Sequence, residues 1–359
     1  DKRASVLARG LKQDISFETK IENNEKVFIN NQFIGNLKGL KLELDFKIGD
    51  LETDIKSLKK AARQNVSPEI SKRIKQIIEG KQIELKEDRK IYWNNFPVAI
   101  LAKGTDYLSP ELNLIIDDIV ENDEKFKLHT FLKKWLDKKI VDELDSLLKL
   151  KSINSVNAQI RALSYQLYEN NGVVKREEVL DIIKDLGQDE RKTLRNLGVK
   201  FGRYHIFLFK LFKPSVVSLR ILLWKNFNGE DLNLHPPTFG LNFVNDVKYK
   251  NKKFMLLCGF EKFDSFFVRI DILERLFIEI INSIESKSDK IKLIPKMLNL
   301  LGCNKENFVK VIKLMGYKVF DEKNETFFKY KPFKKIKKSL DIKIKKNNPF
   351  EALKQLNLK

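Results

Sequence analysis

Cysteine, histidine and long apolar runs are scarce in this sequence of 359 residues. Only two cysteines, Cys258 and Cys303, occur. Two cysteines are too few for a four-cysteine zinc site or a disulfide framework, so we expect buried free thiols in a reducing, cytoplasmic compartment. There is no run of eighteen apolar residues and no signal peptide, so we expect no membrane-spanning helix.

The sequence motifs of several enzyme classes are also missing. No GxxxxGK[ST] phosphate-binding loop, HExxH metal motif, nucleophile elbow or glycine-rich dinucleotide fingerprint occurs. The stretch DELD at 142–145 has the form of an ATP-motor motif, but it lies in a predicted amphipathic helix, so we interpret it as solvated acids. The three histidines, His129, His205 and His235, are far apart in sequence, and His205 is predicted to be structural. We expect no cofactor or metal in this segment; a catalytic site built from distant residues remains the alternative.

Positive charge is the strongest compositional signal. Lysine and arginine number 69 against 49 acidic residues, which gives a formal charge of +20. Such an excess favours a polyanionic partner, nucleic acid first and an anionic membrane surface second. The alternative is that the lysines serve solubility alone. Hydrophobic residues make up 42% of the chain, enough to bury a core.

The first 150 residues contain an internal repeat. The segment KVFINN at 26–31 returns as KIYWNN at 90–95, and Leu37 matches Leu101 at the same offset. Each copy is typical of a strand, an Asn-Asn turn and a second strand, because asparagine tolerates the positive φ of tight hairpin turns. We therefore predict two β-hairpin-plus-helix units in 1–150. The helices expected after the hairpins are 51–62 and 69–79, separated at Ser67-Pro68, and then 110–120 and 126–150.

Residues 151–228 are predicted to form a helical domain of the bundle type. Apolar residues recur at helical spacing from Ile160 to Leu167, and Asn171-Gly172 ends that helix. An apolar, aromatic run, YHIFLF, occupies 204–209. Pro214 fits the first turn of a further helix, where its missing donor costs nothing. The helices expected after the first are 179–186, 188–197 and 215–224.

A linker and a winged-helix-like domain are predicted in 229–330. Glycine and proline are frequent in 226–253, which indicates a loop region. After it the pattern is helix, helix, turn, helix and β-hairpin, the order of a winged helix-turn-helix. The elements expected are helices at 268–284, 293–301 and 305–315 and strands at 317–320 and 326–330.

The last stretch, 331–359, is predicted to be a basic tail. Eight of the sixteen residues in 331–346 are lysine and one is acidic. Unstructured lysine runs often bind polyanions without specificity. The predicted fold class is thus mostly α with small β-hairpins, an α+β chain. It comprises the hairpin-plus-helix repeat, a helical bundle, a winged-helix-like C-terminal unit and this tail.

Three sets of cationic side chains are candidates for contact with nucleic acid. The first alternates with the rings of Phe201, Tyr204 and Phe212, and the second lies on the second helix of the predicted winged unit. The third is the lysine tail, which would act as a tether. Cations neutralise phosphate charge, and rings stack on unpaired bases. The alternative for each set is an ordinary solvated face, and the rings of YHIFLF are interpreted as core. The predicted binding residues are Arg195, Lys200, Arg203, Lys210, Lys213, Arg220, Lys305, Lys310 and Lys313.

Several long segments resemble one known family. The segments on which the resemblance depends are NAQIRALSYQLYENNGVVKREEV, LGVKFGRYHIFLFKLFKPSVVSLRILLW, VRIDILERL, LLGCNKENFVKVIKLMGY and NPFEALKQL, together with IYWNNFPVAILAKGTDYLSPEL upstream. They are similar to the C-terminal half of bacterial relatives of the mitochondrial degradosome RNA helicase, a superfamily-two DExH-type motor. The likeness covers residues 90–359 and only weakly 1–90. The sequence departs from the family at Phe209-Lys210, where a proline is usual.

The resemblance implies an accessory, nucleic-acid-binding part of an ATP-dependent helicase. The motor motifs of that family lie in its N-terminal half, so ATP and Mg²⁺ are expected there and not in this segment. Asp1 in place of methionine fits a piece of a longer protein. The expected partners are single-stranded RNA or DNA and the helicase core, without a membrane. The alternative function is a non-catalytic basic scaffold or protein-interaction module.

Overall fold

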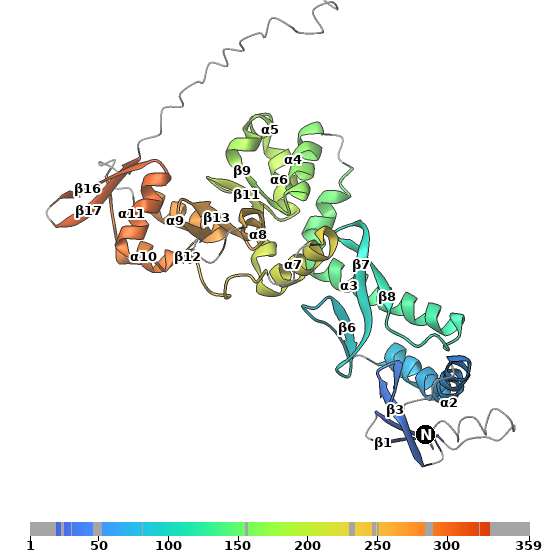
Figure 1. Cartoon of the computed structure of the whole chain (residues 1–359). Helices are drawn as coiled ribbons and strands as arrows, with labels where there is room; N and C mark the ends of the chain where they lie inside the picture. Colours follow the sequence, from blue (N-terminus) through green and yellow to red (C-terminus); the bar gives the residue numbers. More distant parts are fainter. Residues whose placement is uncertain are drawn as a thin grey trace, which may run out of the picture. The chain divides into compact units, whose positions relative to one another are not determined.

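The computed structural model describes most of the chain between residues 19 and 330, and the predicted basic tail lies outside the described part. The chain divides into two compact units. Figure 1 labels the helices and strands along it. One unit comprises residues 1–278 and 300–302, and the other comprises 279–299 and 303–359. The described residues are 19–22, 25–29, 31–45, 52–80, 82–154, 157–229, 234–245, 249, 251–283, 290–322 and 324–330, without the side chains of Gln32 and 52–61.

Helices alternate with small antiparallel sheets along the described chain, so the predicted α+β class is confirmed. Two four-stranded sheets come first, each with its strands in sequence order. The strands of the first sheet are β1 (Thr19–Glu22), β2 (Lys26–Ile29), β3 (Gln32–Lys38) and β4 (Lys41–Leu44). Those of the second are β5 (Ile83–Leu85), β6 (Lys90–Trp93), β7 (Phe96–Asp106) and β8 (Ser109–Leu114).

The two four-stranded sheets share details of backbone geometry at corresponding positions. The pairing of β2 with β3 shifts register after Val27, and that of β6 with β7 shifts after Ile91. Asn31 and Asn95 hold φ values of 63° and 67° at the two hairpin turns. The predicted Asn-Asn turns therefore occupy the left-handed conformation that asparagine tolerates.

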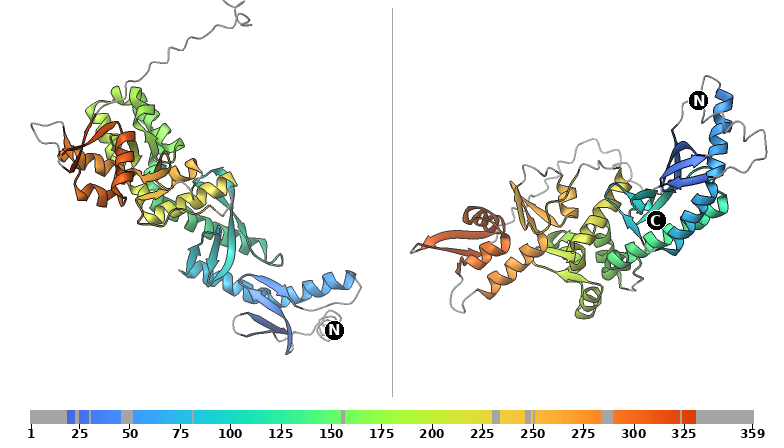
Figure 2. Two further views of the ribbon diagram at one scale, coloured as in Figure 1. Left: turned by 60° about the vertical axis from the view of Figure 1, so that its left-hand side comes forward. Right: turned by 90° about the horizontal axis from the view of Figure 1, so that it is seen from below.

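The helix after the first sheet is continuous, although the sequence predicted a break at Ser67-Pro68. Helix α2 (Glu52–Glu79) contains Pro68 in its interior, and it lies alongside the first sheet (Figure 2). Proline removes one backbone hydrogen bond. The apolar stripe nevertheless keeps its phase across the proline and is buried throughout, which offsets that loss. Its buried members are Ala62, Val66, Ile70, Ile74 and Ile77.

The helix predicted at 110–120 is wrong, because these residues begin as strand β8. Pro110 and Leu112 are buried whereas Glu111 and Asn113 are exposed, which is the two-residue alternation of a strand. A proline followed by acids and apolar residues also resembles a helix start, and that signal misled the prediction. The helix expected at 126–150 is present as α3 (Asn122–Lys151), with a kink at Leu144.

The predicted helical domain, 151–228, also contains a three-stranded sheet. Strands β9 and β10 have only three residues, and β11 is buried at every position, so none carries an alternating pattern. The helical elements are α4 (Ala158–Glu169), η1 (Arg176–Val179), α5 (Leu180–Lys184), α6 (Gln188–Asn196), η2 (Phe209–Phe212) and α7 (Pro214–Asn228). The strands are β9 (Val173–Lys175), β10 (Val199–Phe201) and β11 (His205–Leu208).

Two further three-stranded sheets follow, the first of them overlapping the predicted linker. The elements from 243 to 282 are β12 (Phe243–Asn245), α8 (Lys252–Leu257), β13 (Phe260–Phe263), β14 (Phe266–Arg269) and α9 (Ile270–Asn282). Those from 291 to 330 are β15 (Ile291–Lys292), α10 (Pro295–Leu301), α11 (Lys305–Leu314), β16 (Tyr317–Glu322) and β17 (Glu325–Tyr330). The helices and hairpin expected after the linker are present, although α9 begins at Ile270 because residues 268 and 269 belong to β14. The elements β12, α8, β13, β14 and β15 were not predicted.

All three of these sheets have the same strand order. The last strand in sequence lies in the middle, in the orders β10-β11-β9, β12-β14-β13 and β15-β17-β16. Each sheet is preceded by a helix, namely α4, α7 and α9. Between the first and second strands lie η1, α5 and α6 in the first of these sheets, α8 alone in the second, and α10 and α11 in the third.

Asp117 joins the two four-stranded sheets through α2. Its carboxylate accepts a hydrogen bond from the backbone N–H of Leu42 at 3.3 Å, and its other oxygen lies 3.1 Å from Nε of Arg63. Its own N–H donates to the carbonyl of Leu40 at 3.0 Å. The side chain is buried, so these contacts replace the water that the charge loses.

We predict that Asp117→Asn lowers the free energy of unfolding by about 1–3 kcal/mol. The neutral amide no longer offers a charged acceptor to Arg63 or to the N–H of Leu42. Denaturant unfolding measures this loss. The matched control is Asp118→Asn, since Asp118 is exposed. The control should change stability by less than about 0.5 kcal/mol. Equal effects of the two substitutions would contradict the role given to Asp117.

Candidate nucleic-acid interface

Two arginines of α6 lie over one half-buried ring. The guanidinium carbon of Arg195 is 5.7 Å from the ring centroid of Phe201, and that of Arg191 is 5.8 Å from it. Arg191 also donates to the carbonyls of Leu186 and Ile183, which fixes its position at the end of the preceding helix. Arg195 is exposed, so its charge is available at the surface.

A hollow of about 290 Å³ lies beside this pair, between the β10–β11 hairpin and α9. Lys200 lies over the ring of Phe209 with its Nζ 4.3 Å from the centroid, and Arg203 lies 5.9 Å from the ring of Phe277. Arg275 lines the same hollow and is exposed. Three cations and aromatic rings therefore share one concave surface of the first unit.

The two acids of this hollow are engaged by other groups. Asp271 forms a two-pronged salt bridge with Arg269, at 2.8 and 2.6 Å. Glu274 accepts three backbone hydrogen bonds, from the N–H groups of Arg203, Tyr204 and His205, at 2.5, 2.8 and 2.8 Å. Both carboxylates are buried and committed to these bonds, so the charged side chains that the hollow exposes are the cations Lys200, Arg203 and Arg275.

Glu274 also determines the conformation of the hairpin turn. The turn residue Gly202 is packed so closely on this carboxylate that a Cβ there would lie 2.4 Å from its Cδ atom. The carbonyl of Gly202 accepts a hydrogen bond from Arg176 at 2.9 Å. The turn is thus held from both sides, and glycine is the residue that leaves room for the carboxylate.

A buried charge network continues from Glu274 through His205. The Nε2 atom of His205 lies 3.0 Å from Glu261, Nδ1 lies 3.6 Å from Glu274, and Lys175 lies 3.1 Å from Glu261. Burial by itself would lower the pKa of His205, but the hydrogen bond with Glu261 and the charges of the two glutamates outweigh it and raise the pKa. Burial would likewise raise the pKa of Glu261, and bonds from His205 and Lys175 lower it instead. The predicted structural role of His205 agrees with this environment.

Arg220 does not belong to the exposed set, which corrects its predicted role in binding. Its side chain is only 2% exposed, and its guanidinium donates to the carbonyls of Leu211 and Leu257. Desolvation lowers its pKa to about 10. The spacing of basic residues in 195–220 gave no sign of this burial, because the carbonyl at the end of α8 comes from a distant part of the sequence.

Lys210 and Lys213, which follow Phe209 in the sequence, are exposed. Lys210 belongs to η2, and Lys213 is the residue just before α7. Neither lines the hollow described above. They extend the basic surface of the hairpin region along the chain without being brought into the hollow.

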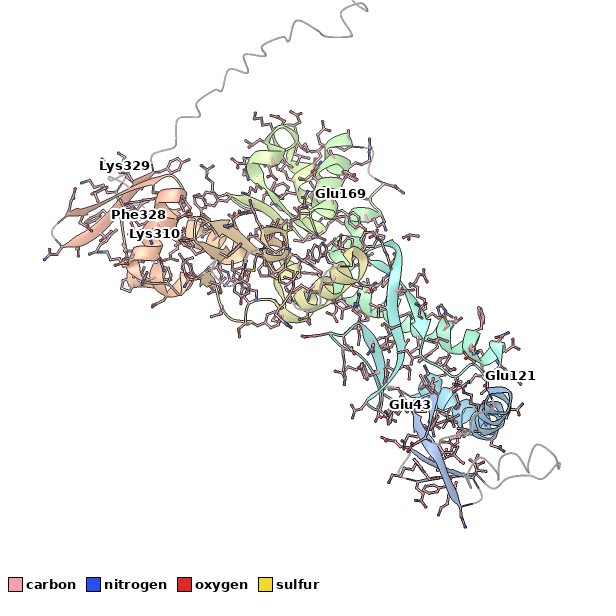
Figure 3. The ribbon with its side chains drawn as sticks, viewed as in Figure 1. Glu43, Glu121, Glu169, Lys310, Phe328 and Lys329 are labelled. Carbon is pink, nitrogen blue, oxygen red and sulfur yellow. The ribbon has the colours of Figure 1, made fainter. Side chains whose placement is uncertain are left out.

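In the second unit, the three predicted lysines are exposed on α11. Lys305 lies 3.8 Å from Asp321, and Lys310 and Lys313 form no salt bridge among the described residues. The opposite side of α11 packs on the sheet, where the ring of Phe308 lies 6.2 Å from that of Phe328 on β17 (Figure 3). The helix therefore presents its lysines to solvent.

Three residues of the interface were missed from the sequence: Arg191, Phe277 and Arg275. Arg191 is in the same predicted helix as Arg195 and could have been found from the spacing of four, which places both on one helix face. Phe277 and Arg275 are about seventy positions downstream of the hairpin. Their approach to it depends on tertiary packing, for which the sequence carries no local signal.

Comparison with known proteins gives no match: no family model fits the chain, and neither the curated proteins nor the solved structures include a similar one. Among the described residues, no helix has the length and apolar character needed to span a bilayer. In the same part of the chain, no three metal-ligating side chains gather into a metal site. Cys258 is buried and Cys303 half-buried, and both are free; burial raises their pKa to about 12 and about 11.

The histidine network predicts a pH dependence of stability. A raised pKa of His205 in the folded state adds stability that is fully present below its unfolded value of about 6.5 and is lost as pH rises through the folded value. The lowered pKa of Glu261 adds stability that is present above about 4.5 and is lost as pH falls through its folded value. The contribution of the pair is therefore greatest between these pH values.

We predict that His205→Gln removes the decline of unfolding free energy above pH 6.5, and that the profile becomes flatter there. Urea unfolding at a series of pH values from 5.5 to 9 measures it. His235→Gln is the control, because His235 is exposed and its replacement should leave the wild-type profile in place. An unchanged slope in His205→Gln would show that the network does not titrate with folding.

Proposed function

We propose that this chain binds nucleic acid as an accessory part of an ATP-dependent RNA or DNA helicase and guides the single strand that the motor moves. The proposal places ATP and Mg²⁺ in motor domains other than this segment, and its partners are the strand and the helicase core. The segmental resemblance to the DExH-type helicase family supports the helicase context. The charge distribution of the first unit supports the binding role.

One observation carries the binding role: exposed cations surround aromatic rings while the neighbouring acids are buried and bonded. Lys200, Arg203 and Arg275 line the hollow, and Arg195 lies over the adjacent ring of Phe201. Surfaces that bind single strands combine cations that neutralise phosphates with rings on which bases stack.

The three-stranded sheets and the helices beside them fit the same proposal. We propose that each of the three-stranded sheets, with its helices, is a winged-helix-like unit, the predicted C-terminal one included. Each has a helix, a strand, one or more helical segments and a hairpin whose last strand is central, and the middle unit has α8 alone in the third place. In helix-turn-helix proteins the second helix of the pair contacts nucleic acid. Here α6 and α11 hold that position, and they carry Arg195, Lys305, Lys310 and Lys313.

We also propose that the two four-stranded sheets are copies of one unit, as the sequence repeat predicts. Corresponding backbone hydrogen bonds support this: Leu37 donates to Glu25 at 2.7 Å, and Leu101 donates to Arg89 at 2.8 Å. All four residues keep the offset seen between KVFINN and KIYWNN.

We predict that Lys200→Gln/Arg203→Gln weakens binding of a single-stranded oligonucleotide by about tenfold or more at low salt. The slope of log K against log salt should also fall by about 0.7 for each phosphate that the variant no longer neutralises. Fluorescence anisotropy with labelled RNA and DNA oligonucleotides, at several salt concentrations, gives both quantities.

The matched control is Lys149→Gln/Lys184→Gln, which removes the same charge from two exposed lysines that pair with acids on their own helices. Its affinity should stay within about twofold of the wild type. If the control weakened binding as much as the site variant, the effect would come from total charge and not from this surface. Binding that is weak and independent of salt would contradict nucleic-acid recognition and favour the basic scaffold.

A further inference from the structure

We infer that the hollow between the β10–β11 hairpin and α9 accepts one unstacked nucleotide, with its base against the phenylalanine rings and its phosphates on the surrounding cations. This inference rests on the proposed function and makes it specific, because it assigns the hollow to a base and not merely to the phosphate chain. The ligand class is a single-stranded RNA or DNA nucleotide.

The walls of the hollow have two kinds of chemistry. Phe209 and Ile278 provide apolar surface that remains exposed, with exposed fractions of 38% and 58%. Arg203 and Arg275 stand on opposite walls, one on the hairpin turn and one on α9. A nucleotide has the complementary arrangement, an aromatic base joined to an anionic phosphate, whereas an inorganic anion would leave the apolar surface uncovered.

The size and rigidity of the hollow favour one nucleotide over a duplex. Its volume of about 290 Å³ lies at the lower end of small-ligand pockets, which run from roughly 300 to 1,000 Å³. The hairpin turn cannot open freely, because Glu274 holds the N–H groups of three successive turn residues, 203 to 205. A site with fixed walls of this size excludes paired bases and admits a base that has left the stack.

The cations over the rings provide a way to expose those rings on binding. Lys200 lies 4.3 Å from the centroid of Phe209, a contact that is weak at an exposed site. A phosphate oxygen offers the ammonium group a stronger, charge-assisted bond. An arriving phosphate would therefore draw Lys200 away from Phe209 and leave the ring face for the base.

The test compares normal strands with strands of the same length that lack bases, using the full chain. Phe209→Leu keeps an apolar side chain but removes the ring, and it should weaken binding of the normal strand by about five- to a hundredfold. Binding of the baseless strand and of duplex should stay within twofold. Phe126→Leu is the control, because Phe126 is 71% exposed on α3, away from the hollow, and it should bind like the wild type.

A second measurement locates the base directly. An oligonucleotide carrying 5-iodouracil, photo-cross-linked to the wild type, should attach to peptides containing 200–209 or 275–278 by mass spectrometry. The inference is overturned if Phe209→Leu weakens normal and baseless strands equally, or if the cross-link maps elsewhere. Loss of the proposed function would look different, since the wild type would then bind neither kind of strand in a salt-dependent way.

Discussion

The candidate interface depends on the hydrogen bonds that the carboxylate of Glu274 accepts from the hairpin turn. The backbone N–H groups of three consecutive residues, Arg203 to His205, donate these bonds, which fix the hairpin turn against α9. This carboxylate also lies beside the His205 ring, which links it to Glu261 and Lys175. A buried carboxylate requires several donors to replace its hydration, and here the backbone supplies them.

Around the hollow, the acids and the cations lie at different depths. Glu261, Asp271 and Glu274 are buried and committed to internal bonds, whereas Lys200, Arg203 and Arg275 are exposed. The carboxylates that stabilise the fold are therefore bonded to groups inside the protein, and the cations that would contact a polyanion lie at the surface.

Local signals in the sequence predicted local structure well. The turns at Asn31 and Asn95 and the helix start at Pro214 each depend on the φ preference of one residue. The prediction failed where a residue type is common at the start of both helices and strands, as at Pro110, which lies at the start of a strand and not of a helix. Contacts between distant segments left no local trace. The bond between His205 and Glu261 and the burial of Arg220 both depend on packing that only the folded chain reveals.

The longer hairpin of the second four-stranded sheet makes contacts with α3 and α4 that, in the described part of the chain, the hairpin of the first sheet does not make. Strand β7 continues to Asp106, whose carboxylate accepts hydrogen bonds from Lys151 and Tyr168, and the ring of Tyr107 lies 5.9 Å from that of Tyr168. Strand β3 stops at Lys38 and has no such extension. A few added residues at a hairpin tip thus connect one of two similar sheets directly to α3 and α4, a contact that the shorter hairpin of the other sheet does not make among the described residues.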